Sequence, residues 1–304
     1  MSCEHPIPAL IDTRFGKNRI FFHWPECPGV RCDSSDLNLL DLPDGVRRVE
    51  LPCGKCFSCH QSRAFNILVR AVAESRMCDF SSFITLTCAD EFYQEVFPGA
   101  VLNHRAFQLF AKRLRKKIGK FRYLMCGEYG ENTGRCHYHV VIFGHRFIDS
   151  FVCNNIYYCS RVLYDAWPYG HIKCSDICNE RLAYVAGYQL KENQCRDGVQ
   201  SYVKWSRRPG LGYFWLRRFW RDLLSDDGKF TFVLNGRRCN ISCRYFFEKF
   251  GCWAPEDYAI LKAQRANSML LVDDDESHIM RHDAIVRHAM VLKHKQKQRK
   301  VDRL

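Results

Sequence analysis

Two histidines at alternate positions, His137 and His139, directly precede the apolar run 140–143. Successive side chains of a β-strand point to opposite faces, so we expect both imidazoles on one face, about 7 Å apart along the chain. Two imidazoles at that separation can bind one divalent cation, although histidine is also an ordinary strand residue. The pair alone leaves a metal site and a purely structural role open.

An acidic residue can complete such a metal site. Glu128 directly follows an expected strand at 122–126, and hairpin pairing with the histidine strand could bring its carboxylate beside the imidazoles. Glu131 lies in the same turn, whereas Asp90 and Glu91 are less well placed. Imidazole and carboxylate ligands together suit Mg²⁺ or Mn²⁺ acting as a Lewis acid on a phosphate.

Two tyrosines, Tyr184 and Tyr188, lie one helical turn apart, and Lys191 follows them. On a helix Tyr188 is about 40° from Tyr184 and Lys191 about 20° to the other side, so the three share one outward line. A phenol can attack a phosphate that a metal ion polarises, and a lysine can stabilise the transition state. Aromatic residues at this spacing also pack against each other in ordinary amphipathic helices. The histidine pair and the basic charge of the chain favour the nucleophilic role.

The elements that position these residues follow from hydrophobic periodicity. Strands are expected at 83–87, 122–126 and 136–143, and helices at 61–77 and 179–192. Asn103 is expected to cap a further helix that ends at Gly119. The chain thus fits an α+β fold with a central antiparallel sheet flanked by helices. Five prolines predict an irregular course for the first fifty residues.

The formal net charge of +13 is concentrated in clusters. Between Lys112 and Arg122 there are seven basic residues and no acidic one, and from Arg281 to Arg303 eight basic residues accompany two acidic ones. Clusters of this kind indicate a polyanionic partner. No strongly apolar amphipathic face accompanies them, which favours nucleic acid over an anionic membrane.

The motifs, in this order, resemble the HUH endonuclease superfamily and, more closely, the replication initiation proteins of gokushovirus-type microviruses, small single-stranded DNA phages. The segments that carry the resemblance are 83–87 with Asp90 and Glu91, 127–130 with 137–139, 184–191, 52–56 and 206–212. In conjugative relaxases of the superfamily the tyrosines precede the histidines, whereas here they follow, as in replication initiators. Cys136 and Gly187 depart from residues frequent in the phage proteins, but neither departure removes a reacting group.

The resemblance implies a five-stranded antiparallel sheet in a ferredoxin- or RRM-like arrangement. It implies His137 and His139 as metal ligands and Tyr184 and Tyr188 as alternating nucleophiles. The implied activity is nicking of single-stranded origin DNA through a 5′-phosphotyrosine intermediate, followed by strand transfer and circle closure. A host helicase and a host DNA polymerase are the expected partners, and the host bacterial cytoplasm the expected location.

Three cysteines, Cys53, Cys56 and Cys59, supply thiols in a turn-rich stretch. Further candidate ligands are Cys3, His5 and His60. Zinc prefers four such ligands, and a second CxxC motif is missing. The cluster is therefore either a structural Zn²⁺ site or a set of buried and loop cysteines, because disulfides are disfavoured in a reducing cytosol.

Aromatic and basic residues interleave between 201 and 221. Single strands are held in this way, with bases stacked on rings and cations beside the phosphates. Core aromatics flanked by solvated arginines would give the same pattern. Within this stretch Trp205 and Arg208 are the preferred DNA contacts, and Arg113, Lys116 and Lys117 are further candidates on the basic face of the helix after Asn103.

Three regions are expected: a Cys-rich N-terminal extension with the first helix at 1–79, an endonuclease core at 80–225 and a C-terminal extension with a basic tail at 226–304. A secretory signal and an apolar run of about 18 residues are not found, so we expect a soluble protein without a membrane partner. Two other functions stay open. One is a zinc-stabilised nucleic-acid-binding module without catalysis, and the other is a metal-dependent nuclease that uses water in place of tyrosine.

Overall fold

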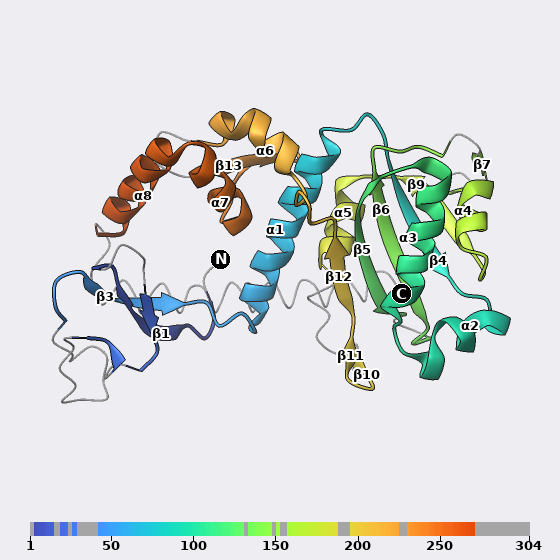
Figure 1. Ribbon diagram of the computed structural model, residues 1–304, viewed down its shortest axis with the longest axis horizontal. Coiled ribbons are helices and arrows are strands. Elements are labelled where there is room, and N and C mark those ends of the chain that lie inside the picture. Colours follow the sequence, from blue (N-terminus) through green and yellow to red (C-terminus); the bar gives the residue numbers. More distant parts are fainter. Residues whose placement is uncertain are drawn as a thin grey trace. The chain divides into compact units, whose positions relative to one another are not determined.

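The computed structural model describes residues 3–14, 19–23, 26–28, 42–130, 133–147, 150–152, 157–187, 195–224 and 230–270. The chain divides into two compact units (Figure 1). The larger unit is Arg63–Val272, and the other includes Met1–Ser62. The three-part division expected from the sequence stays a prediction.

A seven-stranded antiparallel sheet forms the centre of the larger unit, in the order β12-β5-β6-β4-β9-β8-β7. Its strands are β4 (Ser81–Thr87), β5 (Arg122–Tyr129), β6 (Cys136–Phe143), β7 (Ser150–Val152), β8 (Tyr158–Ser160), β9 (Ile172–Asp176) and β12 (Tyr202–Trp205). The expected α+β fold with a central antiparallel sheet is confirmed. The sheet is wider than the five strands that the resemblance implied, because the three-residue strands β8 and β7 extend one edge.

The middle of this sheet has the ferredoxin-like order. Helix α3 (His104–Ile118) connects β4 to β5, and α4 (Arg161–Ala166) lies between β6 and β9 in the chain. Both connections span neighbouring strands, which gives the spatial order β5-β6-β4-β9. The expected ferredoxin- or RRM-like arrangement therefore holds for these four strands.

One face of the sheet is covered by α3 and α4, which pack against each other. Asn103 accepts a hydrogen bond from the backbone N–H of Arg105 and so caps α3, as its side-chain chemistry predicts. Phe107, Phe110 and Leu114 are buried against the sheet. Gly119 ends the helix with φ +80°, a conformation that glycine adopts without strain.

The opposite face is covered by helices from distant parts of the chain (Figure 1). They are α1 (Phe57–Ser75), α5 (Asn179–Ala186), α6 (Tyr213–Phe219) and α7 (Arg244–Trp253), with the hairpin β13 (Thr231–Leu234) and β14 (Arg237–Asn240). The remaining elements of the larger unit are α2 (Asp90–Val96), the 3₁₀ turns η3 (Pro98–Ala100) and η5 (Trp220–Leu223), the hairpin β10 (Cys195–Arg196) and β11 (Val199–Gln200), and α8 (Pro255–Leu270).

The expected irregular course of the first fifty residues is wrong. A three-stranded antiparallel sheet forms there, in the order β2-β1-β3, from β1 (Ile7–Asp12), β2 (Arg19–Phe21) and β3 (Val46–Leu51). Strand β2 pairs only with Leu10, Ile11 and Asp12. Pro8 therefore lies where β1 has an open edge, and a strand tolerates the missing N–H of proline at such a position.

Most cysteines in the described ranges carry free thiols, as expected. Cys159 departs from the expectation, because it is disulfide-bonded. Among the described helices, none combines the length and the apolar character that crossing a membrane requires.

Candidate metal and nucleophile site

The pairing of β5 with β6 brings the expected metal ligands onto one face of the sheet. Glu128 lies directly opposite His137, and His139 follows two residues along β6. Directly opposed residues of an antiparallel pair point to the same face, as do residues two apart on one strand. This is the face covered by α1 and α5, because Val141 and Phe143 of the same alternation belong to the core on that side.

The three side chains form a compact cluster in which the possible ligand atoms all lie within 4.8 Å of one another. Nε2 of His137 pairs with Oε1 of Glu128, and Nε2 of His139 lies 3.1 Å from the same oxygen. Burial raises the pKa of Glu128, but the hydrogen bonds and charges of the two histidines outweigh it and lower this pKa to about 2. A buried, ionised carboxylate beside two imidazoles is a donor set that a divalent cation can use.

The far side of each imidazole is also bonded, which fixes the ring orientation. Nδ1 of His137 lies 3.1 Å from the carbonyl oxygen of Arg135. A carbonyl only accepts, so Nδ1 carries the hydrogen and Nε2 is left as the ligand atom. Nδ1 of His139 lies 2.9 Å from Oγ1 of Thr85, and Phe83 stacks on the same ring. Outer partners of this kind orient metal-binding histidines.

Tyr184 lies at the edge of this cluster. Its hydroxyl donates to Glu128, at 3.2 Å from Oε1 and 3.5 Å from Oε2, and its ring meets His139 edge-on. Leu182 and Val185 bury the other side of α5 in the core, as the sequence predicted for an apolar docking face. The side chain of Tyr184 is 42% exposed, so its hydroxyl combines contact with the cluster and access from solvent.

The second tyrosine and the lysine of the motif, Tyr188 and Lys191, lie outside the described residues, as does the alternative ligand Glu131. The helix expected at 179–192 is described as α5 up to Ala186. Asp90 does not join the cluster, because it pairs with the guanidinium of Arg135 at the start of α2.

Comparison with known proteins adds to this geometry. A family model described as replication-associated protein ORF2 matches residues 81–193. That segment contains Glu128, His137, His139 and both tyrosines. The replication-associated protein ORF4 of Chlamydia phage 1 is 29% identical over 241 residues, which are 70% of this chain and 57% of that protein. The replication-associated protein VP4 of Bdellovibrio phage phiMH2K is 30% identical over 186 residues, which are 55% of this chain and 58% of that protein.

The chain is a relative of phage replication-associated proteins. The resemblance to gokushovirus-type replication proteins is thereby confirmed. The chain spans less than two thirds of the length of either phage protein. No solved structure matches it.

Three of the expected DNA contacts lie on the other side of the sheet from the histidines. Arg113, Lys116 and Lys117 belong to α3, which covers the opposite face. Arg113 donates to the carbonyl oxygen of Ala166 and to the hydroxyl of Tyr169, and Lys117 pairs with Asp165. The structure therefore does not bring this basic face to the metal cluster.

The other two expected contacts lie nearer the histidine face. Trp205 pairs with Leu124 at the end of β12 and packs beside the core on that face. Arg208 is exposed in the loop that follows. Arg122 fixes this loop by donating to the carbonyl oxygens of Pro209 at 2.9 Å and Gly210 at 3.0 Å.

Sequence reasoning missed Thr85, Phe83 and the carbonyl of Arg135. Thr85 pairs with His139 across β4 and β6, two strands far apart in the chain. The register of such a pair cannot be read from the periodicity of either strand. A threonine at an alternate position of the neighbouring strand was the one available signal.

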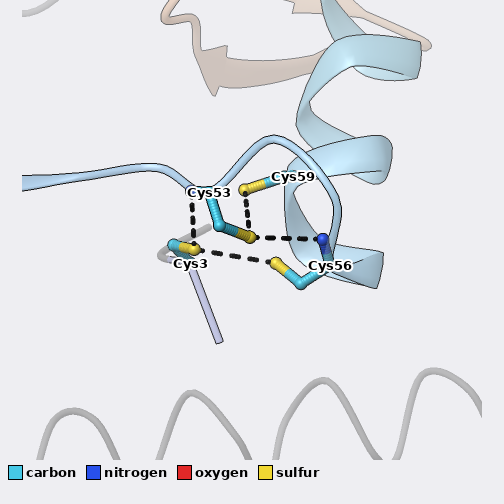
Figure 2. Close-up of side chains that lie close together, drawn as sticks. All are labelled: Cys3, Cys53, Cys56 and Cys59. Carbon is cyan, nitrogen blue, oxygen red and sulfur yellow. Dashed lines mark hydrogen bonds between the residues drawn. The ribbon is translucent and has the colours of Figure 1, made fainter. Parts of the chain in front are cut away.

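The cysteine cluster lies in the other unit and has a fourth member. Sγ atoms of Cys3, Cys53, Cys56 and Cys59 all lie within 4.8 Å of one another (Figure 2). Backbone N–H groups of Lys55 and Cys56 lower the pKa of Cys53 to about 6, whereas burial raises the pKa of Cys59 to about 12. Of the candidate fourth ligands, Cys3 therefore joins the cluster, and His5 and His60 do not.

Proposed function

We propose that this protein is a metal-dependent initiator of rolling-circle DNA replication that nicks single-stranded origin DNA with a tyrosine nucleophile. The proposal rests on the kinship with phage replication-associated proteins and on the cluster of Glu128, His137 and His139. The single observation that carries it is the Tyr184 hydroxyl, 3.2 Å from Oε1 of Glu128. A water-using nuclease has no need of a phenol at that position.

Glu128, His137 and His139 are the residues that would hold the metal, with Mg²⁺ or Mn²⁺ suited to the mixed donor set. A bound metal would polarise the scissile phosphate and favour the ionised form of the phenol. Glu128 positions the phenol by accepting its hydrogen bond. A pKa of about 2 makes this carboxylate too weak a base to act as the proton acceptor in its own right.

The proposed reaction begins when the oxygen of Tyr184 attacks the phosphorus at the nick site. A bond forms between that oxygen and phosphorus, the bond from phosphorus to the 3′ oxygen breaks, and the departing oxygen takes up a proton to give a 3′-hydroxyl. The 5′-phosphate stays bonded to the protein, so the bond energy is kept for rejoining. We propose Tyr188 as the second nucleophile, for strand transfer and circle closure, and Lys191 as a cation for the transition state.

The proposed DNA path begins with Trp205 and Arg208, which lie on or beside the histidine face. An aromatic ring and a cation together suit a single strand with unpaired bases. Arg113, Lys116 and Lys117 are a second candidate surface, on the far side of the sheet. A host helicase and a host polymerase would act on the nicked origin, which places the proposed activity in the cytoplasm of the infected bacterium.

The test is a nicking assay with purified protein, Mn²⁺ or Mg²⁺ and a labelled single-stranded oligonucleotide that covers the candidate origin. Tyr184→Phe, Tyr188→Phe and the double variant are compared on a denaturing gel, with Tyr164→Phe as an exposed-tyrosine control. The expected result is a covalent protein–DNA adduct that disappears in the double variant. Cleavage without an adduct would indicate the water-using nuclease, and binding without cleavage would indicate a nucleic-acid-binding module.

A further inference from the structure

Four cysteines from three separate segments converge in the N-terminal unit (Figure 2). Cys3 precedes β1, Cys53 and Cys56 lie in the loop between β3 and α1, and Cys59 lies in the first turn of α1. Cys3 is 50 residues from Cys53. The fold of the unit, and not the local motif, therefore supplies the fourth thiol.

The sulfur–sulfur distances fit one metal ion. Tetrahedral zinc with Zn–S bonds of about 2.3 Å holds its sulfurs about 3.8 Å apart. Sγ of Cys3 lies 3.7 Å from Sγ of Cys56, and Sγ of Cys53 lies 4.0 Å from Sγ of Cys59. A disulfide would need about 2.05 Å, and a multi-iron cluster would hold its thiolates farther apart because several ions lie between them.

Backbone N–H groups point at the sulfurs, as negatively charged thiolates require. Cys53 receives two such groups, from Lys55 at 3.4 Å and Cys56 at 3.3 Å. Sγ of Cys56 accepts from the backbone of Glu4 at 3.4 Å, and Sγ of Cys3 accepts from the backbone of Cys53 at 3.2 Å. Gly54 has φ +74°, which allows the tight turn that directs these groups. Charge-assisted hydrogen bonds of this kind favour the ionised, metal-binding form of a thiol.

The unit around these cysteines has little else to stabilise it. Its core cluster of buried side chains consists of Leu10, Cys27 and Val46 among the described residues. Small units with so little apolar burial commonly depend on a disulfide or a structural metal. A carboxylate oxygen of Glu4 also accepts from the backbone and hydroxyl of Ser58, so the start of β1 meets the start of α1 at this point through more than the thiols.

We propose that Cys3, Cys53, Cys56 and Cys59 bind one structural Zn²⁺ ion that fastens the segment before β1 to the start of α1. The ion has no part in catalysis. Its site is complete within the N-terminal unit and shares no residue with the cluster of Glu128, His137 and His139. The proposal stands whether or not the protein nicks DNA.

The first test measures zinc in the full-length protein after zinc saturation under reducing conditions and removal of free metal. The unaltered protein and the His137→Ala/His139→Ala variant are expected to retain about one zinc per chain, whereas Cys56→Ser loses at least about fivefold. Cys252→Ser, at an exposed cysteine, serves as the matched control. Zinc that is lost in the histidine variant and kept in Cys56→Ser would overturn the proposal.

A second measurement does not depend on the folding of any cysteine variant. Cobalt is added to the full-length His137→Ala/His139→Ala protein, and its absorption spectrum is recorded. Sulfur-to-cobalt charge-transfer bands and the strong visible bands of a tetrahedral site are expected. Alkylation followed by peptide mapping should protect the four cysteines until a chelator is added. Absence of the bands, or equal alkylation with and without zinc, would overturn the proposal.

Discussion

Thr85 and His139 face each other across β4 and β6, and the threonine Oγ1 lies 2.9 Å from Nδ1 of the imidazole. The bond leaves Nε2 directed at Glu128. Thr85 thus lies behind the ligand, where it can set the orientation of the ring without touching the metal. Its contribution can be measured separately from those of the three ligands.

Thr85→Val is expected to weaken Mn²⁺ binding about 10- to 100-fold, because outer partners of metal-binding histidines typically contribute that much. Isothermal titration calorimetry of the purified protein measures the affinity. Thr231→Val, the same change at a buried strand position, is the control and should leave the affinity unchanged. An unaltered Mn²⁺ affinity in Thr85→Val would show that the ring is held by its packing alone.

Metal addition is expected to stabilise the larger unit. Mn²⁺ at about 100 times its dissociation constant should contribute about 2.7 kcal/mol, since it binds only the folded state. For a unit of this size that corresponds to a rise in Tm of about 5–10 °C, measured by calorimetry with and without a chelator. Glu128→Gln should remove most of this rise. A variant that keeps the full rise would exclude Glu128 as a ligand.

Tyr184→Phe separates the nucleophile from the metal ligands. The hydroxyl contacts Glu128, but the ligand atoms come from other side chains, so Mn²⁺ affinity should stay within about threefold, equivalent to the loss of one hydrogen bond at most. Adduct formation at this position should disappear. A parallel loss of metal affinity and cleavage would instead assign the tyrosine a role in building the site. Calorimetry and the denaturing gel supply the two readouts.

The buried pair of Glu74 and Arg122 holds the loop that carries Arg208. Glu74 accepts from the backbone of Gly212 at 2.7 Å, and its partner binds two carbonyls of the same loop. Glu74→Met should lower the free energy of unfolding by about 3–5 kcal/mol, because it leaves a guanidinium without its buried partner. Denaturant unfolding measures the loss.

Two controls apply to this pair. Glu248→Met breaks the exposed pair with Arg244 and should cost less than about 1 kcal/mol. The double variant Glu74→Met/Arg122→Met should be less destabilised than Glu74→Met alone, since no buried charge is left over. A double variant that is as unstable as the sum of its parts would contradict this account.

Arg208→Ala is expected to reduce affinity for a short single-stranded oligonucleotide and to lower the salt dependence of binding by about one unit of slope. Lys116→Ala, an equally exposed cation on the opposite sheet face, should have a smaller effect. Fluorescence anisotropy at several salt concentrations measures both. The reverse ranking would move the DNA path to α3.

Local rules account for the elements that the sequence predicted well. Asn103, Gly119 and the apolar positions of α3 specify that helix within fifteen residues, and alternation specifies β6. Glu128 was expected beside the histidines because a hairpin joins β5 to β6, and such pairing is local. These residues depend on few distant contacts.

The features that were missed depend on distant contacts. Thr85 pairs with His139 at a separation of 54 residues, and Cys3 meets Cys56 at a separation of 53. Helix α1 begins at Phe57 instead of 61 because Glu4, far away in the chain, accepts from Ser58 in its first turn. Periodicity within a window of residues carries no information about such pairs.

The order of the strands also bears on how the site is assembled during folding. Glu128 and His137 belong to a hairpin, so bringing them together closes only a short loop, whereas Tyr184 meets Glu128 at a separation of 56 residues. Loop closure costs more entropy for longer loops and slows the contacts that need it. We therefore expect the ligand pair to form ahead of the nucleophile contact, and the edge strand β12, which pairs residues about 80 positions apart, to close the sheet late.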